Sequence, residues 1–306
     1  MRNPLTSLPN ISKYFPDRFS EKDAIASPSV GIGAIAPWFL SLTIGCIAVL
    51  NISPVRAQST IPTPGFTNIS DAATLAQTPA NAPTELTKLL SEIDAAANRR
   101  DIKAVMKFYS QNFTHSDGLN PQSLEKAIAQ FWQRYSTLQY RTELKSWKAE
   151  GQAFIAETET TISGTQKMEN IEMNLTSTIR SQQRFENQKI VQQEILAERN
   201  QLTSGKNPPT IQMNLPEQVN VGQEYSFDAV VQEPLGNDVL IGTALEEPIT
   251  EKTLLSTNPI ELELLASGGV FKIGKAPETP ENRWISAVLM RQGGITVITQ
   301  RLRVVK

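Results

Sequence analysis

Cysteine and histidine are almost absent from this chain, whose 306 residues contain one of each, Cys46 and His115. Cys46 lies in an uncharged apolar run, so the residues after it have no thiol for a disulfide, a Cys-ligated metal or a nucleophile. A single histidine cannot build a histidine metal cluster, and the H-E-x-x-H spacing is missing. We therefore expect no metal and no cofactor, and a fold held together by burial of its core.

Excess positive charge is also missing. The whole chain has a formal net charge of −2, with 29 basic and 31 acidic residues. Residues 1–57 hold five of the basic and three of the acidic residues, so the remainder carries a net charge near −4. Such a chain has no basic patch that could neutralise several phosphates, which argues against a nucleic-acid partner. The sequence also lacks a Gly-rich phosphate loop and a G-x-S-x-G nucleophile elbow.

The N-terminal region contains the most informative positive signal. Residues 30–50 are apolar and uncharged, and Val55-Arg56-Ala57 follows with the small-x-small form of a peptidase site. This pattern predicts a secretory signal peptide cleaved after Ala57. An uncleaved membrane anchor is an alternative, because the run is long enough to cross a bilayer. A lipoprotein is a third, since residues 43–46 resemble a lipobox ending in Cys46. All three place residues 58–306 outside the cytoplasm, in the periplasm or cell envelope, with membrane contact only through the N-terminal segment.

Residues 58–83 are rich in Gln, Ser, Thr, Pro and Ala, a composition typical of a disordered linker. Apolar residues at helical spacing then predict helices over residues 84–98 and 102–109, capped by Thr84 and Asp101. Asn120-Pro121 opens a third expected helix, whose buried stripe runs to Tyr135 and Leu138.

Alternating residues replace the helical pattern from Tyr140 onward. They predict at least four antiparallel strands up to Arg199, with Ser163-Gly164 ending one strand and a hairpin turn at residues 186–188. Helices followed by antiparallel strands indicate an α+β domain over residues 84–203, with the helices on one face of a curved sheet.

Residues 200–209 are expected to form a linker that separates this domain from a second one, residues 204–306. Short alternating segments and Gly or Pro turns predict seven or eight strands there. The size and pattern are typical of an all-β sandwich of immunoglobulin-like dimensions, with Trp284 in its core. Because each half has its own apolar pattern, we expect the two domains to fold independently.

The first domain resembles the nuclear transport factor 2-like superfamily, and within it the SnoaL-like branch. The helix pair over residues 86–109, the segment Tyr109–Gly118, the helix from Pro121 and the strands of residues 140–199 carry this resemblance. It implies a cone of three helices and a bent sheet around an apolar pocket. The family includes isomerases, cyclases and hydratases as well as non-catalytic binding and dimerisation domains, so the fold leaves the function open.

Candidate acid–base residues are few. His115 and Asp117 are close in sequence and border the pocket mouth in the chain order of the family, where either would serve as a base. The competing interpretation is that residues 115–118 form an exposed turn facing water. Glu157 and Glu159 share one strand face and would divide acid and base work, but such pairs are common on solvated sheet faces.

Aromatic residues supply the candidate binding site. Tyr109, Trp132, Tyr135 and Tyr140 surround the expected pocket and would line a site for a hydrophobic ligand, although the same spacing is typical of plain core residues. The polar run of residues 180–184 would form a solvated face or a docking surface.

These observations favour an exported bacterial envelope protein that binds a small apolar ligand or a protein partner without catalysis. Two alternatives stay open: an isomerase or cyclase working by proton transfer at His115 or Asp117, and a structural module that dimerises through its sheet.

Overall fold

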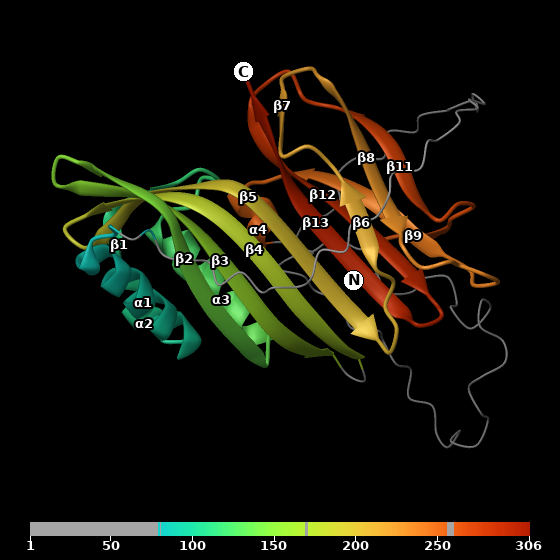
Figure 1. Ribbon diagram of the computed structural model, residues 1–306, viewed down its shortest axis with the longest axis horizontal. Helices are drawn as coiled ribbons and strands as arrows, with labels where there is room; N and C mark the ends of the chain where they lie inside the picture. Colours follow the sequence, from blue (N-terminus) through green and yellow to red (C-terminus); the bar gives the residue numbers. More distant parts are fainter. Residues whose placement is uncertain (1–78, 80, 169–170, 256–259) are drawn as a thin grey trace, which may run out of the picture.

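The computed structural model describes residue 79 and residues 81–168, 171–255 and 260–306 (Figure 1). The predicted signal or anchor, residues 1–57, and most of the predicted linker, residues 58–83, lie outside the described residues. Within these ranges, no helix combines the length and the apolar character that crossing a bilayer requires.

Three helices precede a series of long strands. In chain order the elements are α1 (Thr84–Asn98), α2 (Ile102–Met106), β1 (Tyr109–His115), α3 (Pro121–Arg134), β2 (Thr137–Glu150), β3 (Ala153–Met168), β4 (Ile171–Glu186) and β5 (Lys189–Gly205). The second half contains β6 (Ile211–Asn214), β7 (Gln218–Asn220), β8 (Glu224–Val231), β9 (Ile241–Pro248), α4 (Glu251–Leu255), β10 (Glu263–Leu264), β11 (Gly269–Lys275), β12 (Glu281–Arg291) and β13 (Gly294–Val305).

Local capping explains where two of the helices begin. The Asp101 carboxylate accepts the Ala104 backbone N–H at the start of α2, as the sequence predicted. The third helix begins at Pro121, also as predicted, and Asn120 forms a capping box with Ser123 there. Three expectations were wrong. The second helix ends at Met106 rather than at residue 109, because Tyr109 already begins β1. Pro83, rather than Thr84, occupies the cap position of α1. The third helix ends at Arg134, because Tyr135 adopts an extended backbone that directs the chain into β2.

The molecule is mostly antiparallel sheet, and one sheet runs through both halves. Its strand order is β10-β9-β12-β13-β5-β4-β3-β2. The join is the antiparallel pair of β5 and β13, which aligns Arg199 with Gln300 and Gly205 with Gly294. The linker expected over residues 200–209 is therefore wrong for residues 200–205, which belong to β5. The two halves are therefore joined by backbone hydrogen bonds between β5 and β13, and not only by a flexible linker.

Both faces of the long sheet are buried at β12 and β13. Helices α1 to α3 lie along the part of the long sheet formed by β2 to β5, whereas the small sheet β11-β8-β6 packs against β12 and β13 (Figure 1). Val288 and Val297 join the core beneath the helices, while Ile285 and Ile298 face the small sheet. Burial on both faces explains why residues 284–289 are buried without alternation.

The two-sheet packing of the second half agrees with the expected sandwich only in outline. Its core lies between β6, β8 and β11 on one side and β12 and β13 on the other, and the short helix α4 interrupts the strands. Trp284 is buried, but it packs with Ile249 and Leu254 near α4 rather than between the two sheets, which corrects its expected place. An immunoglobulin-like identity for this part stays a prediction.

Gly164 does not end its strand, contrary to expectation, since β3 continues to Met168. A Cβ atom at Gly164 would lie 2.6 Å from the Thr137 carbonyl oxygen. A residue without a Cβ atom is needed because β2 and β3 approach closely here. Close approach of another backbone is a common reason for a glycine within a strand that does not end there.

Candidate functional site

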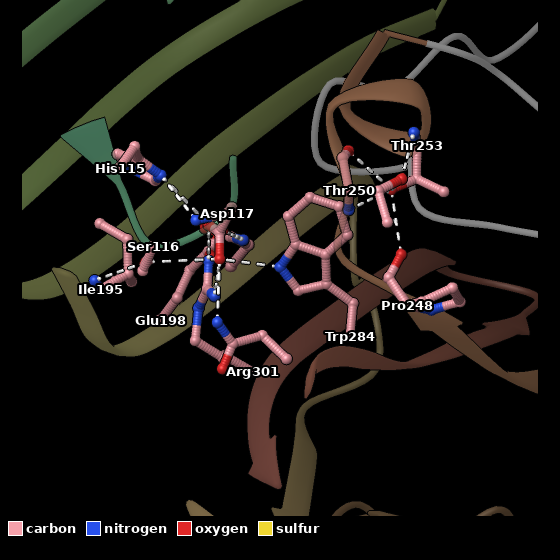
Figure 2. Close-up of polar contacts among 12 residues, drawn as sticks. His115, Ser116, Asp117, Ile195, Glu198, Pro248, Thr250, Thr253, Trp284 and Arg301 are labelled. Carbon is pink, nitrogen blue, oxygen red and sulfur yellow. Dashed lines mark hydrogen bonds and ion pairs between the residues drawn. The ribbon is translucent and has the colours of Figure 1, made fainter. Parts of the chain in front are cut away.

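The chief polar cluster of the described residues lies where the two halves meet. Asp117 comes from the turn between β1 and α3, and Glu198 comes from β5. Arg301 comes from β13 and Trp284 from β12. Figure 2 shows these side chains converging. We call Asp117, Glu198, Trp284, Asn282 and Arg301 the junction cluster.

A tight turn aims Asp117 into the junction. The Gly118 N–H donates to the His115 carbonyl at 3.0 Å, and Gly118 has a φ of 79°, a conformation that favours glycine. The Ser116 N–H donates to the Gln193 carbonyl on β5 at 3.0 Å. The turn is thus attached to the sheet, and Asp117 points toward β13 rather than toward solvent.

Arg301 holds both carboxylates of the cluster. Its Nη1 and Nη2 donate to Asp117 Oδ1 and Oδ2, each at 2.8 Å, the parallel arrangement that guanidinium and carboxylate favour. Nη2 also donates to Glu198 Oε2 at 2.9 Å. The Arg301 side chain is 2% exposed, so these bonds lie in the interior.

The surrounding donors complete the cluster. Trp284 Nε1 donates to Glu198 Oε2 at 3.1 Å, and Asn200 Nδ2 donates to Glu198 Oε1 at 2.8 Å. Asn282 Nδ2 donates to Asp117 Oδ1 at 3.0 Å. All four carboxylate oxygens therefore accept hydrogen bonds from the protein itself, which is what buried charges require.

The electrostatics of the cluster follow from this pairing. Burial alone would raise the pKa of Asp117, but the charge and hydrogen bonds of Arg301 outweigh burial and hold that pKa below its usual range. Burial alone would lower the pKa of Arg301, and the two carboxylates instead raise it. Asp117 is therefore a weaker base than a free carboxylate.

The exposed turn expected from the sequence is correct for Ser116 and Gly118, which are exposed, but wrong for the side chains of His115 and Asp117, which are buried. The His115 side chain is 7% exposed, and its Nδ1 accepts the Asp117 backbone N–H at 3.1 Å. An accepting Nδ1 assigns the proton to Nε2, so the ring is neutral. Burial lowers the pKa of His115 and outweighs the opposing effect of the Asp117 charge.

The four aromatic candidates all face the core beneath the helices. Trp132 and Tyr135 belong to that core, and Tyr109 and Tyr140 pack against it. Trp132 Nε1 donates to Tyr140 Oη at 2.9 Å. Burial raises the pKa of Tyr109 to about 12, and burial likewise raises the pKa of Tyr135 and of Tyr140. These phenols stay protonated over the physiological range.

Two of the remaining sequence candidates lie in ion pairs. Glu157 lies 3.5 Å from Arg180 Nε, and Glu159 lies 3.0 Å from Lys145 Nζ. Both carboxylates are one-third exposed. This arrangement agrees with a solvated sheet face rather than with a shared acid–base site.

Two neighbouring polar atoms in the interior have no protein partner within the described ranges. Ser177 on β4 and Asn200 on β5 are directly opposite each other in the sheet, and Ser177 Oγ and Asn200 Oδ1 are both buried and unpaired. Unpaired buried oxygens side by side are a common place for an ordered water.

Two of the hollows on the surface of the described part are large, and neither includes a residue of the junction cluster. One, about 460 Å³, lies between α1, α2 and the turn joining β4 to β5. We call it the helix groove. The other, about 470 Å³, lies over β2 and β3 and includes Tyr140 and Asn98. Among the described residues, no three His, Cys, Asp or Glu side chains are grouped so as to hold a metal ion.

Sequence reasoning missed Glu198 and Arg301. In β13 the residues on both faces are buried, so the alternation that would mark Arg301 as facing inward is hidden. The local sequence offers no clear signal, because β5 also contains Glu194 and Arg199 and β13 also contains Arg303.

Comparisons with known proteins relate only parts of the chain to known families and folds. Residues 206–305 match a family model described as "Domain of unknown function (DUF8623)". No curated protein matches the chain.

Similar solved structures include SnoaL-like and related proteins. A putative scytalone dehydratase from Novosphingobium aromaticivorans is 6% identical, with 36% of this chain and 80% of that chain covered and a TM-score of 0.32. A putative SnoaL-like polyketide cyclase from Shewanella putrefaciens is 12% identical, with 37% and 89% covered and a TM-score of 0.29.

Another match is the Bdellovibrio bacteriovorus protein Bd1075, at 15% identity and a TM-score of 0.28. The match covers 36% of this chain and 38% of Bd1075, less than two thirds of that protein. TM-scores this low carry no argument about chemistry, so the function is argued below from the residues themselves.

Proposed function

We propose that this chain is an exported, non-catalytic binding module of the cell envelope, in which His115 and Asp117 are structural. The observation that carries the proposal is the two-pronged ion pair between Arg301 and Asp117 in the interior. It engages Asp117, one of the two candidate bases of the sequence, in holding the two halves together.

The state of His115 supports the same conclusion. A general base needs a free lone pair within reach of a substrate proton. The Nδ1 lone pair of His115 already accepts a backbone N–H, and the carboxylate oxygens of Asp117 accept from Arg301 and Asn282. Neither residue lines the helix groove or the hollow over β2 and β3.

Export is the second part of the proposal. It rests on the apolar run of residues 30–50 and on Val55-Arg56-Ala57. A mature chain without cysteine is indifferent to an oxidising compartment, and its buried ion cluster needs no metal to stay paired.

The helix groove supplies a place for an apolar ligand. Its volume of about 460 Å³ lies within the range of small-molecule sites, roughly 300–1,000 Å³. Leu89 and Phe108 contribute apolar surface to it. By contrast, the aromatic residues that the sequence favoured as a binding site pack in or against the core, and only Tyr140 among them also lines one of the two hollows, the one over β2 and β3.

Two measurements on the full chain test this proposal. Titration with a neutral, environment-sensitive dye such as Nile red should give saturable binding, because an apolar groove is available. Enolisable ketones in D₂O, followed by NMR, should show no protein-dependent exchange of their α-protons. Exchange by the wild type that disappears in a folded Asp117→Asn variant would establish the proton-transfer alternative. Absence of saturable dye binding would remove the ligand-binding role.

One observation favours a protein partner as a second candidate role. Phe271 and Ile273 are 56% and 77% exposed on β11, an edge strand of the small sheet. Exposed apolar residues on a sheet edge are a site for pairing with another chain. A second copy of this chain is the simplest such partner. Sedimentation of the wild type against an Ile273→Lys variant tests it, and a concentration-dependent dimer lost in the variant is the supporting result.

A further inference from the structure

The helix groove is hollow because its walls are built from short side chains. Ala95 and the almost fully buried Ala96 of α1 line it together with Ala104 of α2, and each of these side chains ends at Cβ. Leu89 and Phe108 provide larger apolar surfaces. The groove therefore offers an apolar channel between the two helices that no side chain of its own walls fills.

The third wall is the turn between β4 and β5. Asn187 and Gln188 both have positive φ, 49° and 61°, the conformation that a two-residue hairpin turn requires. The turn brings Lys189 to the groove beside them. This wall is polar and cationic, whereas the helical walls are mainly apolar.

Cationic side chains dominate the rim of the groove. Arg99, Lys107 and Lys189 line it and are all exposed. The one acidic residue of the lining, Glu92, lies 3.7 Å from Lys88 and has its own cation there. Within the described part of the chain, no carboxylate forms an ion pair with Arg99, Lys107 or Lys189. The groove thus combines an apolar body with an excess of positive charge.

Helix dipoles explain part of this charge but not all of it. Arg99 and Lys107 are the C-cap residues of α1 and α2, where a cation balances the partial negative charge of a helix end, about half an elementary charge. Helix α2 has only five residues, so its dipole is small. Lys189 lies at the start of a strand and balances no helix end. A net positive charge therefore remains for a ligand.

We propose that the helix groove binds a free single-chain anionic amphiphile, with its alkyl chain along Ala95 and Ala104 and its carboxylate or phosphate head group among Arg99, Lys107 and Lys189. This inference rests on the proposed binding role and specifies the class of its ligand. Neutral apolar molecules of the same length lack the head-group contacts and bind more weakly.

Calorimetric titration of the full chain with laurate and with dodecanol, both below the concentration at which they aggregate, tests the proposal. Laurate should bind about tenfold more tightly than dodecanol. The variant Lys107→Gln/Lys189→Gln should remove most of this preference, since each exposed ion pair contributes about two- to fivefold in affinity. Dodecanol binding should be unchanged in that variant. The matched control Lys103→Gln/Lys126→Gln removes two exposed charges that do not line the groove.

A second variant tests where the alkyl chain lies. Ala95→Trp places a large side chain in the groove and should abolish binding of both ligands, while Ser91→Trp, an exposed position of α1 outside the groove lining, should not. Circular dichroism checks that each variant is folded.

The possible outcomes separate this inference from the proposed function. Equal affinity for laurate and dodecanol, or a preference that survives the lysine variant, overturns the anionic ligand but leaves apolar binding in place. Absence of binding by either ligand overturns both. Co-sedimentation with phosphatidylglycerol vesicles that needs Lys107 and Lys189, without binding of free laurate, would replace the free amphiphile with a membrane surface.

Discussion

Arg301 and Asp117 are 184 positions apart in the chain, and their side chains form two parallel hydrogen bonds of 2.8 Å in the interior. Asp117 belongs to the turn that begins α3, whereas Arg301 belongs to the last strand. The pair therefore spans the boundary that the sequence placed between two domains. Together with the pairing of β5 and β13, it makes the junction a built part of the interior rather than a flexible link.

Removing the cation of this cluster should be costly. Arg301→Met leaves Asp117 and Glu198 as buried carboxylates without their positive partner, which typically costs about 3–5 kcal/mol. The free energy of unfolding, measured by urea titration, should fall by that amount. Arg303→Met is the matched control on the same strand. Arg303 is 24% exposed and pairs with Glu194, so its loss should cost less than about 1 kcal/mol.

Equal effects of the two arginine substitutions would contradict the structural role of the cluster. The structural role would also be contradicted if no substitution of Asp117 restored any of the stability lost in Arg301→Met. Because the penalty comes from stranded charge, adding Asp117→Asn to Arg301→Met should restore part of the lost stability.

His115 should produce a measurable pH dependence. Burial lowers its pKa, so the unfolded chain takes up a proton, at about pH 6.5, before the native protein does. The stability associated with neutral His115 is complete above that pH. It is lost as the pH falls from there toward the native-state pKa, by up to about 1.4 kcal/mol per pH unit.

Urea titrations between pH 7.5 and 5.5 check this expectation. His115→Asn keeps an acceptor for the Asp117 N–H but does not titrate, so its stability should fall less steeply than that of the wild type. The charges that act on His115 are Asp117, Arg301 and Glu198. The low pKa of Asp117 keeps this carboxylate ionised throughout the range. Parallel profiles for the two proteins would mean that His115 titrates alike in the folded and unfolded states.

Local signals in the sequence were sufficient for local structure. Asp101 caps α2 and the third helix begins at Pro121, both as expected, because each signal involves residues at most three positions apart. The sequence-based predictions failed where contacts between residues far apart in the chain determine how a side chain packs. Trp284 packs beside α4, and the sequence could not show this because β12 is buried on both faces and has no alternation that would assign a side chain to one face. The turn of His115 and Asp117 is bonded to β5 and β13, and no residue near it in sequence carries that information.

Processing of the N-terminus remains to be measured. Because Val55-Arg56-Ala57 follows an apolar run, the mature chain should begin at or near Gln58 and carry no residue of the run. N-terminal sequencing of protein from the membrane and soluble fractions of the native host checks this. An intact Met1 terminus found only in membranes would replace the signal peptide with an anchor. A lipid-modified Cys46 as the first residue would establish the lipoprotein alternative.

The isolated first half gives the sharpest test of the domain boundary. The sequence predicted that residues 84–203 fold alone, whereas the structure leads us to expect a fragment of low stability. In the fragment, the edge of β5 loses its partner β13, and the core beneath the helices loses Val288 and Val297. Burying a valine fully is worth about 1.5–3 kcal/mol, and a typical domain has only about 5–15 kcal/mol in total.

The ion cluster contributes little to this loss, because Asp117 and Glu198 regain water when the second half is absent. A fragment of residues 84–205 should therefore unfold with a lower urea midpoint than residues 79–306, and it should self-associate through the free β5 edge. Circular dichroism and sedimentation measure both effects. A monomeric fragment with the midpoint of the longer chain would show that the first half is an independent domain, and that β13 adds to a sheet that is already stable without it.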